Sequence, residues 1–167
     1  MIYVFDFEGF RLKTEFVVKE FAFCDLEEFS SDSKLFSPPF SWKRLNSQEK
    51  RTAAYCEKYI HQIRWSQEGT PLEDLNEVIQ SKITTEDIIY VKGEYKRSVL
   101  LSILKEDYVV KNLEEIHCPK ISDLAKNYEL AVQCSYSRHK QHHHCALYKA
   151  NIFARWLKKE LKTMNHE

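Results

Sequence analysis

The first strand of this chain is predicted from the stretch IYVFDFE, residues 2–8, in which apolar and aromatic side chains lead into the acids Asp6 and Glu8. Alternation and strand-forming residues place this strand at 2–7 and a second one at 15–23. Gly9 lies between the two runs. The pattern therefore predicts a β-hairpin that turns at Gly9.

Strands and helices are interleaved along the rest of the chain. Residues 27–40 are rich in serine and proline, which predicts a loop with a short strand at 34–36. Further strands are expected at 87–91 and 108–110, and helices at 47–59 (with Ser47 as N-cap), 71–79, 94–104, 121–128 and from 139 or 144 to 162. This order favours an α/β sheet flanked by helices.

Length and composition indicate one domain spanning residues 1–167. An apolar content of 43% supplies a core, and at this length folding should bury roughly 70% of the unfolded surface. Basic and acidic residues balance at 25 each, so any nucleic-acid binding requires a local patch rather than bulk charge. We find no membrane span or signal peptide in the sequence and expect an intracellular protein, cytoplasmic or nuclear. Five cysteines then suggest thiols or metal ligands before disulfides.

Two segments resemble the DEDDh group of 3'-5' exonucleases. Those enzymes begin with an Asp-x-Glu pair, as at Asp6 and Glu8, and end with a helix reading His-x-Ala-x-x-Asp-Ala, which HCALYKA at 144–150 resembles. The resemblance implies an RNase H-like mixed sheet flanked by helices and a site in which carboxylates hold two divalent cations, with a histidine near the attacking water. It assigns Asp6, Glu8 and His144 to that site. Lys149, however, stands where the group has its last aspartate.

The middle of the chain resembles the same group in the same order. A His-Gly-Ile turn is matched by HQI at 61–63, and residues 91–100 follow a strand as the group's His-Asn-x-x-Phe-Asp-x-x-Phe-Leu segment does. On this alignment Tyr95 and Lys96 match the Phe-Asp pair. A second acid of the exonuclease site is therefore also a lysine.

These two charge reversals predict a degenerate site. The ammonium groups of Lys96 and Lys149 would replace the metal ions as counter-ions of Asp6 and Glu8, and we expect no magnesium or manganese. In the alternative interpretation both lysines point to solvent and the two acids simply end a strand. The alternative function is an active metal-dependent 3'-5' exonuclease or RNase that uses Asp6, Glu8 and His144.

A second group of residues predicts a structural zinc site. Cys134, His139 and Cys145 offer three ligands of the types that zinc prefers, and Cys118 is our first choice for the fourth. Glu15 is the alternative, because the run 15–23 resembles a ligand-bearing strand of the Maelstrom domain. That family has an RNase H-like fold without the exonuclease acids, and its zinc is held by Glu, Cys, His and Cys. The Cys-to-His spacing here differs from that pattern.

The expected partner is nucleic acid, specifically single-stranded RNA, or else a protein. The cations predicted to bind nucleic acid are Lys92, Lys96, Arg97, Lys149 and Arg155. Charged residues on exposed helices are also common as plain solvated surface, and that interpretation stays open. Resemblance to the Maelstrom domain implies a role in RNA or transposon silencing.

Overall fold

The computed structural model describes residues 1–105, 107–130 and 142–166, and these form a mixed five-stranded sheet with helices on both faces. The strands are β1 (Ile2–Arg11), β2 (Phe16–Asp25), β3 (Ser31–Leu35), β4 (Ile88–Val91) and β5 (Val109–Asn112). Their order across the sheet is β3-β2-β1-β4-β5. β1 pairs with β2, and β2 with β3, in antiparallel fashion, whereas β4 is parallel to both β1 and β5. The predicted α/β class is confirmed.

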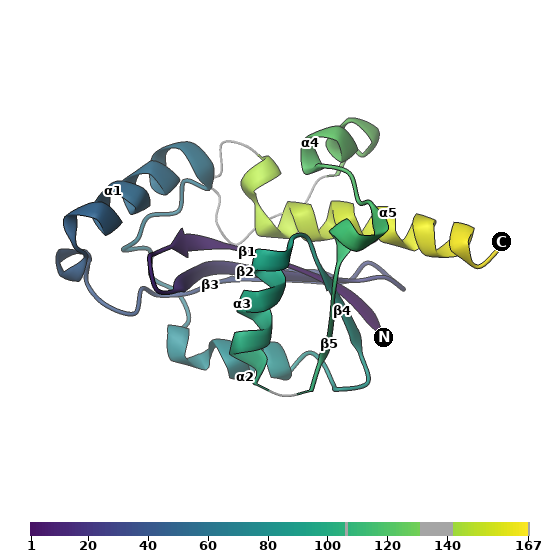
Figure 1. The fold of residues 1–167 in the computed structure, drawn as a ribbon, viewed down its shortest axis with the longest axis horizontal. Coiled ribbons are helices and arrows are strands. Elements are labelled where there is room, and N and C mark those ends of the chain that lie inside the picture. The colour runs from purple at the N-terminus through teal and green to yellow at the C-terminus, as the bar shows by residue number, and fades with distance from the viewer. Residues whose placement is uncertain (106, 131–141, 167) are drawn as a thin grey trace.

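The α-helices of this region are α1 (Ser47–Tyr55), α2 (Leu75–Gln80), α3 (Glu94–Leu104), α4 (Ile121–Leu124) and α5 (Ala146–Met164). Figure 1 shows α5 crossing one face of the sheet, α2 and α3 on the other face, and α1 beside the end where β1 turns into β2. None of the helices within these ranges is long and apolar enough to cross a membrane.

Alternating side chains of β1 and β2 enter cores on the two faces of the sheet, and Phe10 and Val17 join a third cluster with Trp65. Val4, Ala22 and Cys24 pack with the apolar side of α5, whereas Phe5 and Phe21 face the helices on the opposite side. Successive strand residues point to opposite faces, so covering both faces requires a nearly continuous apolar strand. This explains why Asp6 and Glu8 are such conspicuous exceptions in β1.

The predicted turn at Gly9 is wrong. β1 continues to Arg11, the chain reverses between Leu12 and Glu15, and the Leu12 amide donates to the Glu15 carbonyl at 2.8 Å. Gly9 instead lies where the pairing of β1 with β2 shifts register. A Cβ atom at Gly9 would lie 1.9 Å from the carbonyl oxygen of Val17. The glycine therefore serves a close approach of two backbones at a bulge, which is the other common role of glycine in a strand.

Other predicted elements are present with shifted ends. The N-cap of α1 is Asn46 rather than Ser47, and Asn46 forms a capping box with Glu49. The expected helix at 47–59 is α-helical only to Tyr55 and continues as a π-helical turn, Cys56–Ile60. The third strand begins earlier than expected, and the helix at 94–104 has the predicted bounds.

We predict that Gly9→Ala destabilises the protein by about 1–3 kcal/mol, because the added methyl group overlaps the Val17 carbonyl and forces the two strands apart. Urea unfolding of the two proteins measures the difference. Lys13→Ala, an exposed change in the neighbouring turn, is the control and should leave stability within about 0.5 kcal/mol. Equal stabilities of wild type and Gly9→Ala would contradict the bulge.

Candidate functional site

Two carboxylates lie on the face of β1 that α5 covers. Asp6 pairs across the sheet with Ala22, which belongs to the α5 core, and Glu8 pairs with Glu20. Asp6 is 1% exposed and Glu8 is also buried. A buried carboxylate is costly unless a partner balances its charge.

Two lysines approach these carboxylates from different helices. Lys149 lies in the first turn of α5 and Lys96 in the first turn of α3. The positive end of a helix dipole disfavours cations at this position, so neither helix is stabilised by its own lysine. Lys96 reaches the site past the edge of β1, because β4 pairs with β1 only as far as Val4.

Each ammonium group contacts both carboxylates. Lys96 Nζ lies 2.5 Å from Asp6 Oδ1 and 4.0 Å from Glu8 Oε1. Lys149 Nζ lies 3.2 Å from Asp6 Oδ2 and donates to Glu8 Oε1. We call Asp6, Glu8, Lys96 and Lys149 the charge cluster. The predicted pairing is confirmed, and the lysines do not point to solvent.

Electrostatics favour the charged forms of Glu8 and Lys149. Burial alone would raise the pKa of Glu8, but the positive charges of Lys149 and Lys96 outweigh it and lower this pKa to about 2. Burial likewise opposes the charge of Lys149, and the negative charges of Asp6 and Glu8 raise its pKa above the usual value. The pKa shifts of both groups favour the ion pair between Glu8 and Lys149 near neutral pH.

The two histidines that the resemblance points to have different surroundings. His144 is half-buried in the 3₁₀ turn His142–His144, just before α5. His61 is fully buried: its Nδ1 accepts from the Ile63 amide at 3.0 Å, so its Nε2 carries the proton and donates to the Gly9 carbonyl at 2.9 Å. Gln62, between His61 and Ile63, has a left-handed φ of 59°.

The cations predicted to bind nucleic acid all have contacts within the protein. Lys96 and Lys149 belong to the charge cluster, and Lys92 donates to the Cys118 carbonyl at 2.5 Å. Arg97 donates to the Val110 carbonyl at 2.8 Å and pairs with Glu94. The guanidinium of Arg155 lies 4.2 Å from the centre of the Phe29 ring. Binding nucleic acid through these five side chains would therefore require breaking contacts within the protein.

The predicted zinc ligands are only partly within the described ranges. Cys134 and His139 lie outside them. Cys118 and Cys145 are buried, whereas Glu15 is exposed in the turn after β1. Burial raises the pKa of the Cys118 thiol to about 12. Within the residues that the structure covers, His, Cys, Asp and Glu do not gather in a group of three or more that fits a metal ion.

Sequence reasoning missed Glu20. This residue lies on β2, is completely buried, and its Oε1 accepts from the Ala146 amide at 2.7 Å. A carboxylate is favourable at the amino end of α5, and this one lies next to Cys145. The sequence does indicate the face on which Glu20 lies. It is two residues before Ala22 and four before Cys24, and alternate residues of a strand share one face.

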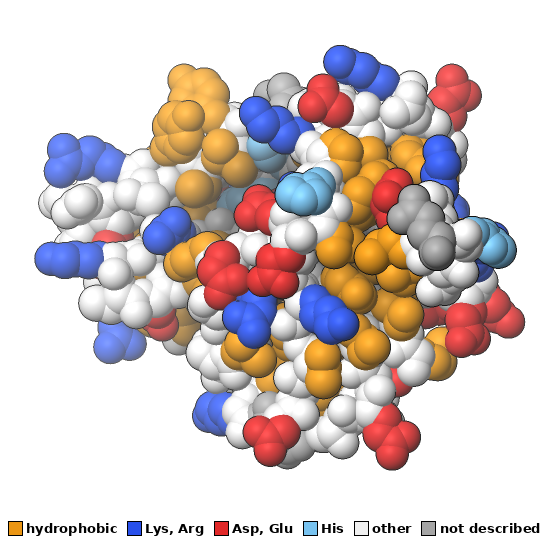
Figure 2. Space-filling view, turned by 45° about the vertical axis from the view of Figure 1, so that its right-hand side comes forward, with side chains coloured by type: hydrophobic (Ala, Val, Ile, Leu, Met, Phe, Trp, Pro, Cys, Tyr) orange, Lys and Arg blue, Asp and Glu red, His pale blue; other side chains and the backbone are white. Residues whose placement is uncertain are grey.

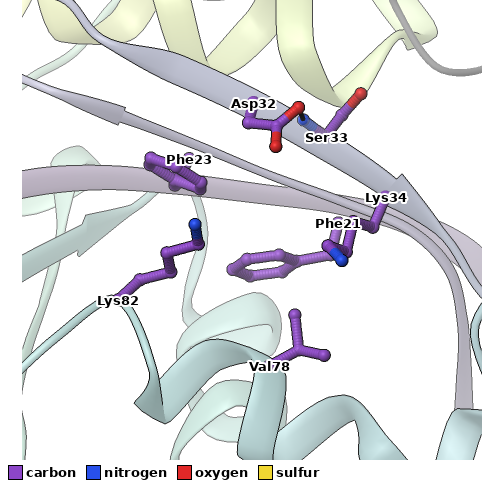
Figure 3. A pocket seen from close by; sticks show the side chains of 7 residues that line it. All are labelled: Phe21, Phe23, Asp32, Ser33, Lys34, Val78 and Lys82. Atoms are coloured by element: carbon purple, nitrogen blue, oxygen red, sulfur yellow. Dashed lines mark hydrogen bonds between the residues drawn. The ribbon is translucent and has the colours of Figure 1, made fainter.

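A small hollow on the opposite face of the sheet is too small for a ligand. It lies between β2, β3 and α2, where Lys82 extends toward Phe23 (Figure 3). Its volume is about 10 Å³, which is the space of about one water molecule.

Neither protein-family models nor curated protein sequences match this chain. The possible function of the charge cluster therefore has to be inferred from its geometry.

We predict that acid removes the stabilisation supplied by Glu8. Its pKa is about 2 in the folded protein against an ordinary value of 4.5, so its contribution is present above about pH 4.5 and is lost as the pH falls toward 2. The loss amounts to about 3 kcal/mol. Urea unfolding between about pH 5 and pH 2 measures it, with Glu8→Gln as the comparison. Identical pH dependence of the two proteins would contradict the ion pairing of Glu8.

Proposed function

We propose that this chain is a catalytically inactive exonuclease-like domain of the RNase H-like type, and that it acts by binding single-stranded nucleic acid, RNA in the first place. The observation that carries the proposal is the charge cluster, in which each of two ammonium groups contacts both Asp6 and Glu8. The lysines take the position that two divalent cations take in the active enzymes of this kind.

Chemistry supports the loss of activity. Two-metal hydrolysis needs cations that coordinate the attacking water and the leaving oxygen at once. An ammonium group has no open coordination position and does not lower the pKa of a bound water in this way. A divalent cation added beside Lys96 and Lys149 would be repelled by both, and the carboxylates that would bind it are already paired. These residues therefore do not fit magnesium or manganese.

The fold also supports the exonuclease-like assignment. A mixed sheet flanked by helices, with Asp6 and Glu8 on its central strand, agrees with what the resemblance implies. Gln62 supplies a second argument, because its left-handed backbone stands where the enzymes have glycine in their His-Gly-Ile turn. A left-handed backbone is expected for glycine and is unusual for glutamine, so its presence at Gln62 agrees with the His-Gly-Ile turn of the enzymes.

We further propose a structural zinc at the start of α5, held by Cys134, His139, Cys145 and Glu20. Glu20 replaces our first choice, Cys118, because its Oε1 accepts from the Ala146 amide at 2.7 Å and so lies beside Cys145. Zinc ligands must lie within a few ångströms of each other, which Glu20 and Cys145 satisfy.

The test of the inactive site is Asp6→Ala. Removing Asp6 leaves two half-buried ammonium groups with one buried carboxylate, so we expect a loss of about 3–5 kcal/mol in the free energy of unfolding. Wild type should not degrade a single-stranded oligonucleotide with manganese. Glu86→Ala, an exposed acid, is the control and should keep wild-type stability. A stable Asp6→Ala variant of a nuclease-active wild type would overturn the proposal.

The zinc has its own test in metal analysis of the purified protein. We expect one zinc per chain, lost together with thermal stability in Cys145→Ser and in Glu20→Gln, because binding energy of a structural zinc adds to folding. The glutamine of Glu20→Gln can still accept the hydrogen bond from the Ala146 amide. A loss of stability in this variant would therefore come from the lost zinc ligand. Glu15→Gln, Cys118→Ser and Cys24→Ser should keep the zinc. A metal-free wild type would rule the site out.

A further inference from the structure

A basic segment lies far from the charge cluster in sequence. Residues 43–64 contain six basic side chains and two acidic ones, a net charge of +4 in a chain whose total is zero. The basic residues are Lys43, Arg44, Lys50, Arg51, Lys58 and Arg64, and all except the half-buried Lys50 are exposed. Figure 2 shows Lys and Arg side chains projecting at the left-hand side of the molecule, where α1 lies.

The two acids of this segment are occupied by backbone groups. Glu49 accepts from the Asn46 amide in the capping box of α1, and Glu57 accepts from the Trp65 amide at 2.6 Å. None of the six cations forms an ion pair with an acid inside the ranges that the structure covers. Their positive charge is therefore available to a partner.

Two exposed tyrosines lie among these cations. Tyr55 is 57% and Tyr59 56% exposed, and their ring centres are 5.1 Å apart. Arg51, Tyr55 and Tyr59 follow at intervals of four residues, so they share one face of the helix. Lys58 Nζ lies 5.1 Å from the centre of the Tyr59 ring. The π-helical turn that carries Tyr59 is a form that occurs frequently at functional sites.

We propose that this face of α1 and of the following turn, Cys56–Ile60, binds single-stranded nucleic acid. Tyr55 and Tyr59 stack on bases, and Arg51 and Lys58 contact the phosphates on either side. Aromatic rings with interspersed cations form the usual platform for single strands, whose bases are free to stack. The net charge of +4 around these rings fits the phosphate backbone of a nucleic acid, whose negative charge dominates binding.

The surface extends toward the end of the β1–β2 hairpin. A hollow of about 300 Å³ separates the hairpin from the start of α1, and it is lined by Arg11 and Lys13 on one side and by Asn46, Gln48, Glu49 and Thr52 on the other. The one acid among them, Glu49, caps α1 by accepting from the Asn46 amide. Both cations are exposed. The bound strand can therefore continue from the tyrosines toward a second positive region, and none of these contacts involves the charge cluster.

This inference rests on the proposed function, because it identifies the surface that binds the nucleic acid. The experiment below distinguishes failure of this surface from failure of the proposed function. Fluorescence anisotropy with labelled single-stranded RNA of about 12 nucleotides is the measurement, at about 50 and 200 mM salt. We expect Tyr55→Ala with Tyr59→Ala to weaken binding about tenfold or more, and Tyr55→Phe with Tyr59→Phe to retain it. Arg51→Glu with Lys58→Glu should weaken binding further and lower the salt slope by about two.

Lys159→Glu with Lys162→Glu makes the same change of charge on exposed positions of α5 and should leave affinity unchanged. Equal weakening by this control would show general electrostatic attraction and overturn the surface. Wild-type affinity in the α1 variants, with folding checked by thermal melting, would also overturn the surface while leaving the proposed function intact. A wild type that binds no RNA at micromolar protein would overturn both and favour a protein partner.

Discussion

The negative charge of Asp6 and Glu8 has to be balanced inside the protein, because both lie on the central strand beneath α5. Lys96 and Lys149 supply that balance from helices that pack on opposite faces of the sheet. The charge cluster thus joins β1, α3 and α5 at one point. Removing any one of its charges leaves the others buried without a full set of partners, which costs more than an exposed ion pair contributes.

Ammonium groups and metal ions can both balance the negative charge of Asp6 and Glu8, but only metal ions support hydrolysis. A bound cation brings chemistry and depends on its concentration in solution, whereas a lysine is covalently part of the chain and its charge is present whenever the protein is made. In the proposed function, this part of the molecule stabilises the fold and no longer reacts. Its cations are engaged in internal contacts, and free positive charge is concentrated instead around α1, where the acids are used for capping and for a backbone contact.

Local patterns predicted most of the secondary structure, because periodicity and capping act over a few residues. The helix Glu94–Leu104 and the buried strand at β4 follow directly from such patterns. Gly9 was misassigned because glycine is favoured both in turns and at close backbone approaches, and only the position of the Val17 carbonyl distinguishes the two. Glu20 was missed for a similar reason: the parity of β2 can be read from the sequence, but the helix end that lies against each face cannot.

The sequence by itself determined that β1 would carry two acids among apolar residues, and it has lysine at the two positions where the resemblance implies acids. It also determined the α/β class, since hydrophobic periodicity reports which face of each element is buried. Tertiary structure alone decided that these lysines meet these acids. The residues in contact are 90 and 141 positions apart, and they converge because the short β4 leaves the edge of β1 open to α3 while the first turn of α5 lies over the same strand. Contacts of that kind depend on sheet register and helix packing, which no local pattern encodes.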